Sequence, residues 1–462
     1  MKKNNQQSSD DRDNSVNSKL SRRDFLKNTS LATAGFYIVP RHVLGGTGYT
    51  APSDTLYIAA VGTGGEGRSD INHFAKSGNA KIAYLCDVDD RRSAGARKAF
   101  PDAHYYNDWR KIFDKESGNF DAVSVSIPDH NHAIVALNAM KRGKHVYVQK
   151  PLTHDIYETS ILVKAAQKYN VVTQMGDQGA SSDGIRTMKE WRDAGIIGDI
   201  KEAWCWTNRP IWPQGIPWPT HHEKVPKGLK WNLWLGTAQD ADYHEAFVPQ
   251  RWRGFWPFGT GSVGDMACHI VGPVFKVVKG LTFPDEVSTS VSTVVKEPKR
   301  RTNWGIEVNY TKSAPVSSSS HLKFTLDNGK EFKVHWMDGG IQPERPDELE
   351  PDQVMGNGGN GALFIGTDGK FMCSTYGHNP RLLPVSMTNE VKVPKKYPRV
   401  PNGSEGHWKQ WVDAAIAGDE SMCDSPFVGY AEHLVPSVLL VNLAIRSFQY
   451  QEPRKNKNGK VT

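Results

Sequence analysis

The sequence contains few cysteines, little excess charge and no long apolar run. Cysteine is scarce, and its five copies lie far apart with no C-x-x-C pair: Cys86, Cys205, Cys268, Cys373 and Cys423. This spacing argues against a metal cage and against a disulfide framework. Excess charge is also small, because residues 1–45 hold eight Lys or Arg and four Asp, and taking that +4 from the total of +7 leaves +3. We therefore expect no nucleic-acid partner.

A long apolar run is missing as well, which bears on the first 45 residues. They run through a polar stretch and Ser21-Arg22-Arg23-Asp24-Phe25-Leu26-Lys27 into an apolar segment from Leu31 to Val39. That segment is far shorter than the roughly 20 residues of a membrane span but suits a signal peptide. The pattern resembles a twin-arginine export signal, with a first helix of the fold as the alternative. It predicts folded export by the twin-arginine machinery to the periplasm or another extracytoplasmic space, without a membrane span in the mature protein.

What the chain does have is length and a glycine-rich motif. Its 462 residues, 38% of them hydrophobic, suffice for two cores. An apolar strand, Leu56–Val61, leads into Gly62-Thr63-Gly64-Gly65-Glu66-Gly67, and a helix and a second strand end on Asp87, twenty residues past Gly67. In this G-x-G-x-x-G, the glycines allow a tight turn and close approach of a pyrophosphate, and the acid accepts hydrogen bonds from a ribose. The unit predicts dinucleotide binding by Gly62, Thr63, Gly64, Gly65, Gly67 and Asp87.

Strands and helices keep alternating after this unit. Apolar strands at 121–127, 144–148 and 171–175 alternate with helices at 133–142 and 156–169. The alternation predicts an α/β fold in which residues 50–177 form a doubly wound parallel Rossmann sheet. Two loops, Pro128-Asp129-His130-Asn131-His132 and Gln149-Lys150-Pro151, follow strands directly. Open parallel sheets bind ligands at that edge.

Residues 178–450 differ in texture and predict a second, α+β domain. Eight of the fourteen tryptophans lie between Trp204 and Trp256, among several prolines, which we interpret as a loop-rich insertion that is partly packing and partly substrate wall. Strands are expected at 287–295, 305–311, 321–326, 331–336, 362–365 and 370–374, and helices at 407–417 and 432–448. Asp327-Asn328-Gly329 is a strong hairpin signal. The sheet should be mainly antiparallel, and the polar residues 451–462 form a tail.

The motifs together resemble the Gfo/Idh/MocA oxidoreductase family. They are the glycine turn with Asp87, the 127–132 loop, Val148-Gln149-Lys150-Pro151 and Gly264-Asp265-Met266-Ala267-Cys268-His269, in family order. The resemblance implies NAD as cofactor, further cofactor contacts from Pro128, His132, Gln149, Lys150 and Pro151, and subunit contacts through an open sheet face in a homo-oligomer. The family's usual Glu-Lys-Pro is Gln149-Lys150-Pro151 here, and a neutral neighbour stabilises an ammonium less than a carboxylate does.

Asp265 and His269 are four residues apart, so on a helix both side chains emerge on one face. Oxidation of an alcohol needs a base for the hydroxyl proton, and histidine titrates in the right range. By resemblance His269 is that base, Asp265 orients it or the substrate, and Lys150 polarises the reacting oxygen; a buried pair satisfied by hydrogen bonds is the alternative. His221-His222 and His130-x-His132 have no matching carboxylate or cysteine set in the sequence, so we expect no metal site.

Three functions from different classes remain open. The first is an NAD(P)-dependent oxidoreductase acting on a sugar, polyol or glycoside hydroxyl. The second is an NAD-dependent, redox-neutral glycoside hydrolase, and the third is a non-catalytic carbohydrate-binding protein. Asp87 would repel the 2′-phosphate of NADP, so NAD is expected, although Arg91 and Arg92 are near enough to receive a phosphate if they turn inward.

Overall fold

The computed structural model describes residues 54–296 and 306–450 of the chain. The expected export signal within residues 1–45 and the expected polar tail, 451–462, lie outside these described residues. The unit that begins at Ser53 contains both sheets and the helices around them. We describe this unit in the order in which its parts build the site.

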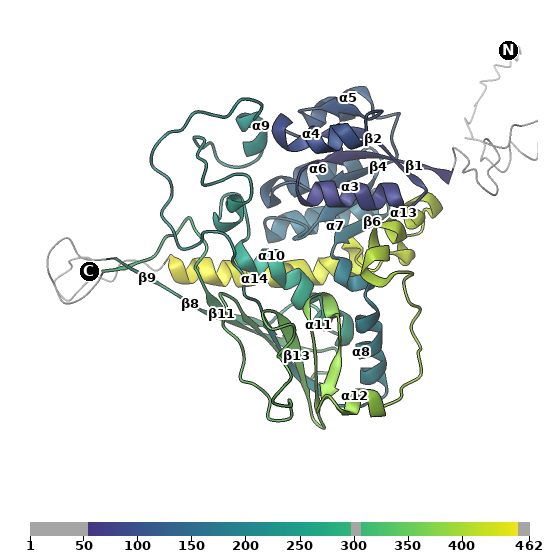
Figure 1. Cartoon of the computed structure of the whole chain (residues 1–462), viewed down its shortest axis with the longest axis vertical. Coiled ribbons are helices and arrows are strands. Elements are labelled where there is room, and N and C mark those ends of the chain that lie inside the picture. The colour runs from purple at the N-terminus through teal and green to yellow at the C-terminus, as the bar shows by residue number, and fades with distance from the viewer. Residues whose placement is uncertain (1–53, 297–305, 451–462) are drawn as a thin grey trace, which may run out of the picture. The chain divides into compact units, whose positions relative to one another are not determined.

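The first sheet has six parallel strands in the order β3-β2-β1-β4-β5-β6 (Figure 1). Their bounds are β1 Leu56–Val61, β2 Ala80–Cys86, β3 His104–Tyr106, β4 Ala122–Val125, β5 His145–Gln149 and β6 Thr173–Gly176. This is the strand order of a Rossmann fold, so the predicted doubly wound sheet is confirmed. The strand β3 was not predicted, because three half-exposed residues give no apolar run.

Helices cover both faces of this sheet. They are α3 Glu66–Lys76, α4 Asp90–Ala99, α5 Trp109–Lys115, α6 His132–Met140, α7 Ile156–Tyr169 and, from near the other end of the chain, α13 His407–Ala417. Trp408 and Trp411 of α13 share one buried cluster with Ile58 of β1 and Phe74 of α3. The core of the dinucleotide-binding domain is therefore completed by residues far downstream of residue 177.

The second sheet has seven strands in the order β15-β14-β13-β7-β12-β11-β8. Their bounds are β7 Ile200–Trp206, β8 Glu286–Val291, β11 Ser318–Thr325, β12 Glu331–Met337, β13 Gly361–Gly366, β14 Lys370–Cys373 and β15 Arg381–Leu383. Only the β7–β12 pair is parallel, which confirms the mainly antiparallel prediction, and β11 and β12 form the expected hairpin. A separate pair, β9 Val294–Lys296 and β10 Ile306–Val308, completes the strands of the described residues.

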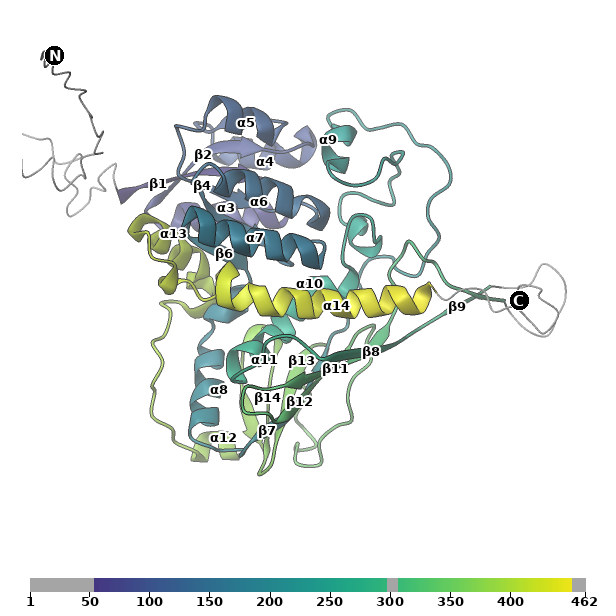
Figure 2. The ribbon, with the colours of Figure 1, turned by 180° about the vertical axis from the view of Figure 1, so that it is seen from behind.

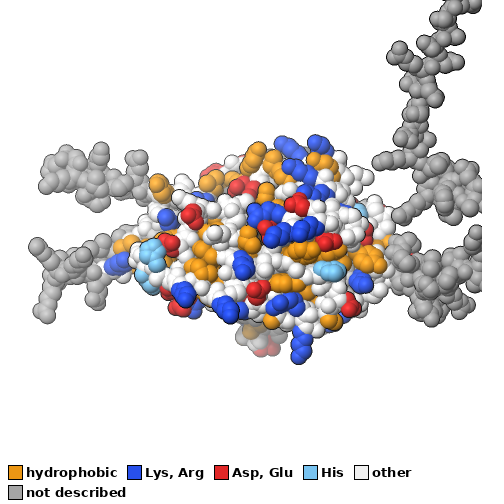
Figure 3. All heavy atoms as spheres, turned by 90° about the horizontal axis from the view of Figure 1, so that it is seen from above, with side chains coloured by type: hydrophobic (Ala, Val, Ile, Leu, Met, Phe, Trp, Pro, Cys, Tyr) orange, Lys and Arg blue, Asp and Glu red, His pale blue; other side chains and the backbone are white. Residues whose placement is uncertain are grey.

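Two helices link the sheets to the site. α10, Gly261–Ile270, packs against α14, Glu432–Gln449, and α14 also contacts α7 and β8 (Figures 1 and 2). Among the described residues one helical stretch, Glu420–Gln449, has the length and hydropathy of a membrane span, but 61% of its apolar window is buried inside the protein. That burial is what a core helix requires. On the face shown in Figure 3, basic and acidic side chains are interspersed with hydrophobic ones.

The tryptophan-rich region is partly regular, contrary to our interpretation of it as an insertion from Trp204 onward. Trp204 and Trp206 belong to β7, the central strand between β12 and β13. Between β7 and α10 the chain is irregular apart from α9, Trp231–Leu235, and a short 3₁₀ turn at Arg251–Gly254. This irregular region has its own buried cluster, which includes Trp231, Trp234, Phe247, Trp252 and Phe258.

Candidate active site

The glycine-rich turn lies at the carboxyl end of β1, and α3 begins directly after it. Gly62 has φ +86°, and a Cβ there would stand 2.1 Å from the backbone oxygen of Ser126. A Cβ on Gly67 would stand 2.1 Å from the oxygen of Gly62. Both positions therefore require glycine, and the amino end of α3 is left facing the space beyond the turn, as in sites that bind a pyrophosphate.

Asp87 closes the carboxyl end of β2 next to this turn. One of its carboxylate oxygens accepts hydrogen bonds from the Thr63 amide at 3.0 Å and the Thr63 hydroxyl at 3.2 Å, and the other accepts from the Asp89 amide at 3.0 Å. Burial raises the pKa of Asp87, and the Thr63 and Asp89 amides oppose that rise. The acid is thus fixed beside the glycine turn before any ribose is present.

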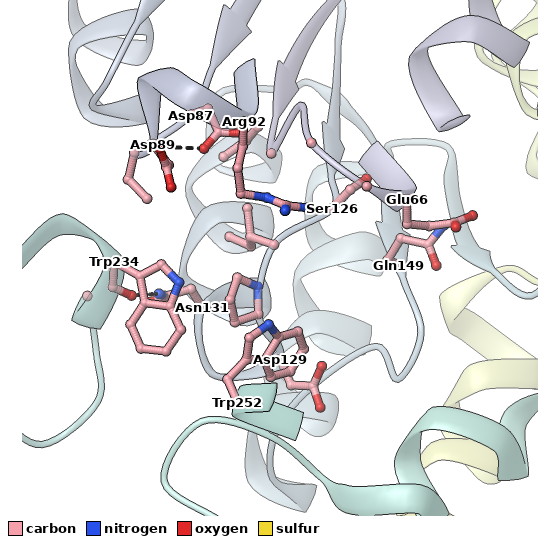
Figure 4. Close-up of a pocket in the computed structure, with 18 of the residues that line it drawn as sticks. Glu66, Asp87, Asp89, Arg92, Ser126, Asp129, Asn131, Gln149, Trp234 and Trp252 are labelled. Atoms are coloured by element: carbon pink, nitrogen blue, oxygen red, sulfur yellow. Dashed lines mark hydrogen bonds between the residues drawn. The ribbon is translucent and has the colours of Figure 1, made fainter. Parts of the chain in front are cut away.

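A cavity of about 710 Å³ runs from the turn to α10 (Figure 4). Of the predicted cofactor residues, those that line it are Gly62, Gly64, Gly65, Asp87, Pro128, Gln149 and Lys150. The others support it from behind: Thr63 binds Asp87, Gly67 permits close packing, and His132 lies 2.9 Å from the oxygen of Pro151 and 2.7 Å from that of Ile127. His132 thereby links the two loops, one of which ends with Pro151.

Lys150, Asp265 and His269 also line the cavity. Lys150 follows β5 and the other two lie on α10, whereas Asp87 follows β2, three places from β5 in the sheet order. The Lys150 ammonium lies 3.0 Å from a carboxylate oxygen of Asp265 and also donates to its backbone oxygen. Although burial lowers it, attraction to Asp265 brings the pKa of Lys150 above its usual value. Asp265 is therefore the acid that stabilises the charged form of Lys150, in place of the glutamate that Gln149 replaces.

Asp265 is bound by cations rather than by His269. Besides Lys150, Arg253 Nε lies 3.3 Å and Arg209 Nε 4.0 Å from its carboxylate oxygens. Burial raises its pKa, but Lys150 and Arg253 prevail and lower it to about 2. Asp265 is consequently a permanent carboxylate at this end of the cavity.

The partner of His269 is Asp177, which the sequence did not reveal. His269 Nδ1 lies 2.9 Å from one Asp177 oxygen, and the Tyr430 hydroxyl donates to the other at 2.7 Å. Because a carboxylate only accepts, Nδ1 carries the ring proton and Nε2 keeps a free lone pair. Burial lowers the pKa of His269, and Lys150 lowers it further. The imidazole is neutral near pH 7 and able to accept a proton.

Position in the sequence could have indicated Asp177. It directly follows β6, at the same carboxyl edge of the sheet as the two loops that we did single out. Tyr376, whose ring centroid lies 4.5 Å from that of His269, and Tyr430 gave no such signal, since neither belongs to a motif.

Two histidine sets that raised the question of metal have protein partners. His130 is buried and lies 3.1 Å from the backbone oxygens of both Phe258 and Trp234. His221, contrary to the sequence expectation, does meet a carboxylate and a second imidazole: Glu223 and His244 form a cluster with it. His244 Nδ1 accepts from the Ala246 amide at 2.9 Å, so its proton is on Nε2, the atom that faces the cluster. A hydrogen bond to His221 Nε2, 2.9 Å away, satisfies that proton.

Comparison with known proteins agrees with this geometry. Residues 56–177 match the Gfo/Idh/MocA domain described as "Oxidoreductase family, NAD-binding Rossmann fold", and residues 212–314 match that family's C-terminal alpha/beta domain. Both matched domains belong to one oxidoreductase family, whose first domain is described as NAD-binding. The chain belongs to this Gfo/Idh/MocA family.

Relatives and solved structures of this kind are distant. A glycosyl hydrolase family 109 protein from Shewanella pealeana is 27% identical over 32% of this chain and 38% of its own length. A levoglucosan dehydrogenase from Pseudarthrobacter phenanthrenivorans is 26% identical over 25% of this chain and 29% of its own. The WlbA dehydrogenase from Bordetella pertussis, solved with NADH and UDP-GlcNAcA, has a TM-score of 0.55 at 15% identity over 85% of this chain and 97% of its own. The chain thus spans 38% and 29% of the lengths of these two curated relatives, and the structural likeness supports the fold alone.

Proposed function

We propose that the protein is an NAD-dependent oxidoreductase that removes hydride from a hydroxyl-bearing carbon of a sugar, polyol or glycoside. One observation carries the proposal: Lys150, Asp265 and His269 meet at one end of a cavity whose other end is the glycine turn. A carbohydrate substrate is supported by relatives named levoglucosan dehydrogenase and inositol 2-dehydrogenase.

The roles follow from the hydrogen bonds. His269 Nε2 accepts the hydroxyl proton, while Asp177 holds the ring in the required tautomer and stabilises the imidazolium that forms. The Lys150 ammonium, fixed by Asp265, stabilises the negative charge that develops on the substrate oxygen. Bound NAD⁺ would take up the hydride. Each task thus has one group with the required charge.

The arginines near Asp87 support NAD over NADP. Arg91 turns away to Asp89, to which it donates at 2.8 and 2.7 Å. Arg92 instead lies over the glycine turn: its Nε would be 3.0 Å from a Cβ on Gly64, and it extends toward Ser126 in Figure 4. Arg92 is therefore suited to the pyrophosphate shared by both dinucleotides, and Asp87 keeps its preference for an unphosphorylated ribose.

A second candidate is redox-neutral glycoside cleavage. In that reaction oxidation beside the anomeric centre acidifies a neighbouring C–H, elimination breaks the glycosidic bond, water adds, and the hydride returns. Relatives named glycosyl hydrolase family 109 favour it. So does the segment 228–237, which is attached to the dinucleotide-binding domain on both sides of the cavity.

The attachments of this segment are backbone and buried contacts. Near Asp87, the Asp90 amide donates to Gly228 O at 2.9 Å and the Lys230 amide to Val88 O at 2.8 Å. At its other end Thr237 donates from its amide and its hydroxyl to Asn131 and His130 at 3.1 and 2.5 Å. A segment that lines the cavity and is attached at both ends supports slow release of the cofactor and exclusion of water from the cavity. A cofactor that stays bound suits a reaction that returns its hydride.

Location and assembly complete the proposal. The twin-arginine motif supports export of the folded protein, and outside the cytoplasm no soluble NAD pool replenishes a released cofactor. The second sheet supports a homo-oligomer, because the outer face of β7, β11 and β12 carries partly exposed side chains such as Trp204 and His321.

The decisive experiment incubates the purified protein with a panel of glycosides, with and without added NAD, beside a His269→Ala control. Cleavage without added NAD and with nucleotide found by mass spectrometry supports the redox-neutral reaction. NADH accumulation that requires added NAD supports an ordinary dehydrogenase. Sugar binding without any conversion would reject both and leave a binding protein.

A further inference from the structure

A buried carboxyl group lies beneath the glycine turn and takes no part in the roles above. Asp70, on α3, is fully buried and accepts hydrogen bonds from three separate elements. Ser126 Oγ donates at 2.7 Å from the end of β4, Trp408 Nε1 at 2.8 Å from α13, and Gln149 Nε2 lies 3.0 Å from both oxygens. The described residues provide no ion pair for Asp70.

Keeping an acid there has a cost. Burial raises the pKa of Asp70 to about 7, nearby Glu66 raises it as well, and the donors Ser126, Trp408 and Gln149 lower it. A buried carboxyl without a cation is destabilising unless its hydrogen bonds offset the lost hydration. A buried acid that destabilises the fold is expected to have a local role, and its three hydrogen-bond donors indicate which groups it holds in place.

Gln149 is the donor that leads to the catalytic end of the cavity. Its amide is confined between Asp70 and Gly176, where a Cβ would stand only 2.7 Å from the Gln149 amide carbon. Its oxygen lies 3.3 Å from the backbone amide of Lys150. The orientation of one carboxamide therefore connects Asp70 to the turn that carries the lysine.

We infer that Asp70 is a positioning residue for Lys150, acting through Gln149. The inference rests on the proposed function in one respect, namely that Lys150 acts on the substrate oxygen. The inference also accounts for the departure from Glu-Lys-Pro. In the contact between these two side chains the carboxyl group belongs to Asp70 and the amide belongs to Gln149. Two carboxyl groups 3 Å apart in this buried place would repel each other, so one of the two positions must be neutral.

Exchange of the two groups tests this directly. Gln149→Glu, Asp70→Asn and the double exchange are compared with the wild type, and Glu190→Gln serves as control because Glu190 is a buried carboxylate bonded to Arg399, away from the cavity. The Tm and the circular dichroism of the bound nicotinamide are measured in protein loaded with NADH. The third readout, kcat and KM on a converted glycoside, is measured in protein loaded with NAD⁺.

Gln149→Glu should lower the Tm by at least about 2 °C at pH 7, with recovery at low pH where the pair shares a proton. Both single variants should alter the nicotinamide signal and lower kcat more than they raise KM, and the double exchange should restore all three readouts. Glu190→Gln should lower the Tm alone.

Two results would overturn the inference. One is wild-type behaviour of Gln149→Glu in every readout. The other is a double exchange that regains the Tm but neither the nicotinamide signal nor kcat, which would make Asp70 a purely structural group. If no glycoside is converted by the wild type, the proposed function fails, and the Tm and the nicotinamide signal still decide the role of Asp70.

Discussion

Replacement of Asp177 by Asn is the sharpest test of the site, because it changes one charge and almost no volume. The carboxylate accepts from His269 Nδ1 at 2.9 Å and from the Tyr430 hydroxyl at 2.7 Å, whereas an amide has one accepting oxygen for these two donors. With that oxygen turned to Tyr430, the amide nitrogen would face the ring N–H. The ring would then favour the tautomer with its proton on Nε2, the atom that has to accept the substrate proton.

The size of the effect follows from the hydrogen bond that is lost. A bond to a charged group contributes about 1.5–3 kcal/mol, and each 1.36 kcal/mol is a factor of ten in rate. Asp177→Asn should therefore lower kcat by roughly 10- to 150-fold, and more if the wrong tautomer predominates. Since Asp177 raises the pKa of His269, the acidic limb of the pH–rate profile should also move to lower pH.

Stopped-flow absorbance of NADH formation in a single turnover measures both effects. Tyr430→Phe removes the other bond to Asp177, 2.7 Å long, and should give a smaller loss without the tautomer change. Asp413→Asn, which alters an exposed pair with Lys409, is the unaffected control. A folded, nucleotide-bearing Asp177→Asn protein with wild-type kcat and pH profile would refute the role of His269 as base.

Four further outcomes are expected. His269→Ala should cost roughly a hundredfold or more in turnover yet keep its nucleotide; undiminished turnover excludes it as base. Arg92→Gln should lose nucleotide on gel filtration and weaken the binding of NAD and of NADP alike. Arg91→Gln should retain the nucleotide, because the Arg91 guanidinium is bonded to Asp89. Equal loss from both variants would contradict the contact between Arg92 and the pyrophosphate. Asp87→Ala should weaken NAD binding in titration calorimetry, and unchanged affinity would reject the contact between Asp87 and the ribose. Because the pKa of Asp70 rises from 3.8 to about 7 on folding, stability to urea should fall as pH rises through that window, and Asp70→Asn should remove that slope.

The sequence predicted best those parts that local pattern determines. The helix expected at 156–169 is observed as α7 with the same bounds, because an Asp155 cap and a left-handed Asn170 end it sharply. β7 was missed because tryptophan and proline content suggested a loop, whereas Trp206 is completely buried in the middle of a sheet. Hydrophobic texture alone does not separate a buried strand from a packed loop.

The sequence predicted individual residues of the candidate site but not which residues are bonded to one another. Motif order brought Lys150, Asp265 and His269 forward, and the structure does place them at one end of the cavity. Helical spacing predicted that Asp265 and His269 share one face, and the family resemblance implied that Asp265 orients His269 or the substrate. In the structure each is bonded to a residue from another element, Asp265 to Lys150 and His269 to Asp177. Such pairing depends on how β6, α10 and the 149–151 turn converge, which no local pattern specifies.

The helix α13 has a consequence for how the chain is made. Trp408 is bonded to Asp70 across 338 positions, and Trp411 lies in the same core as β1. Chains emerge from the ribosome amino end first, so the dinucleotide-binding half has an uncovered apolar face until α13 has been synthesised. A truncated product that ends before His407 would leave that face permanently exposed. Nascent chains should therefore need a chaperone over this face, and only full-length molecules would reach the compact state.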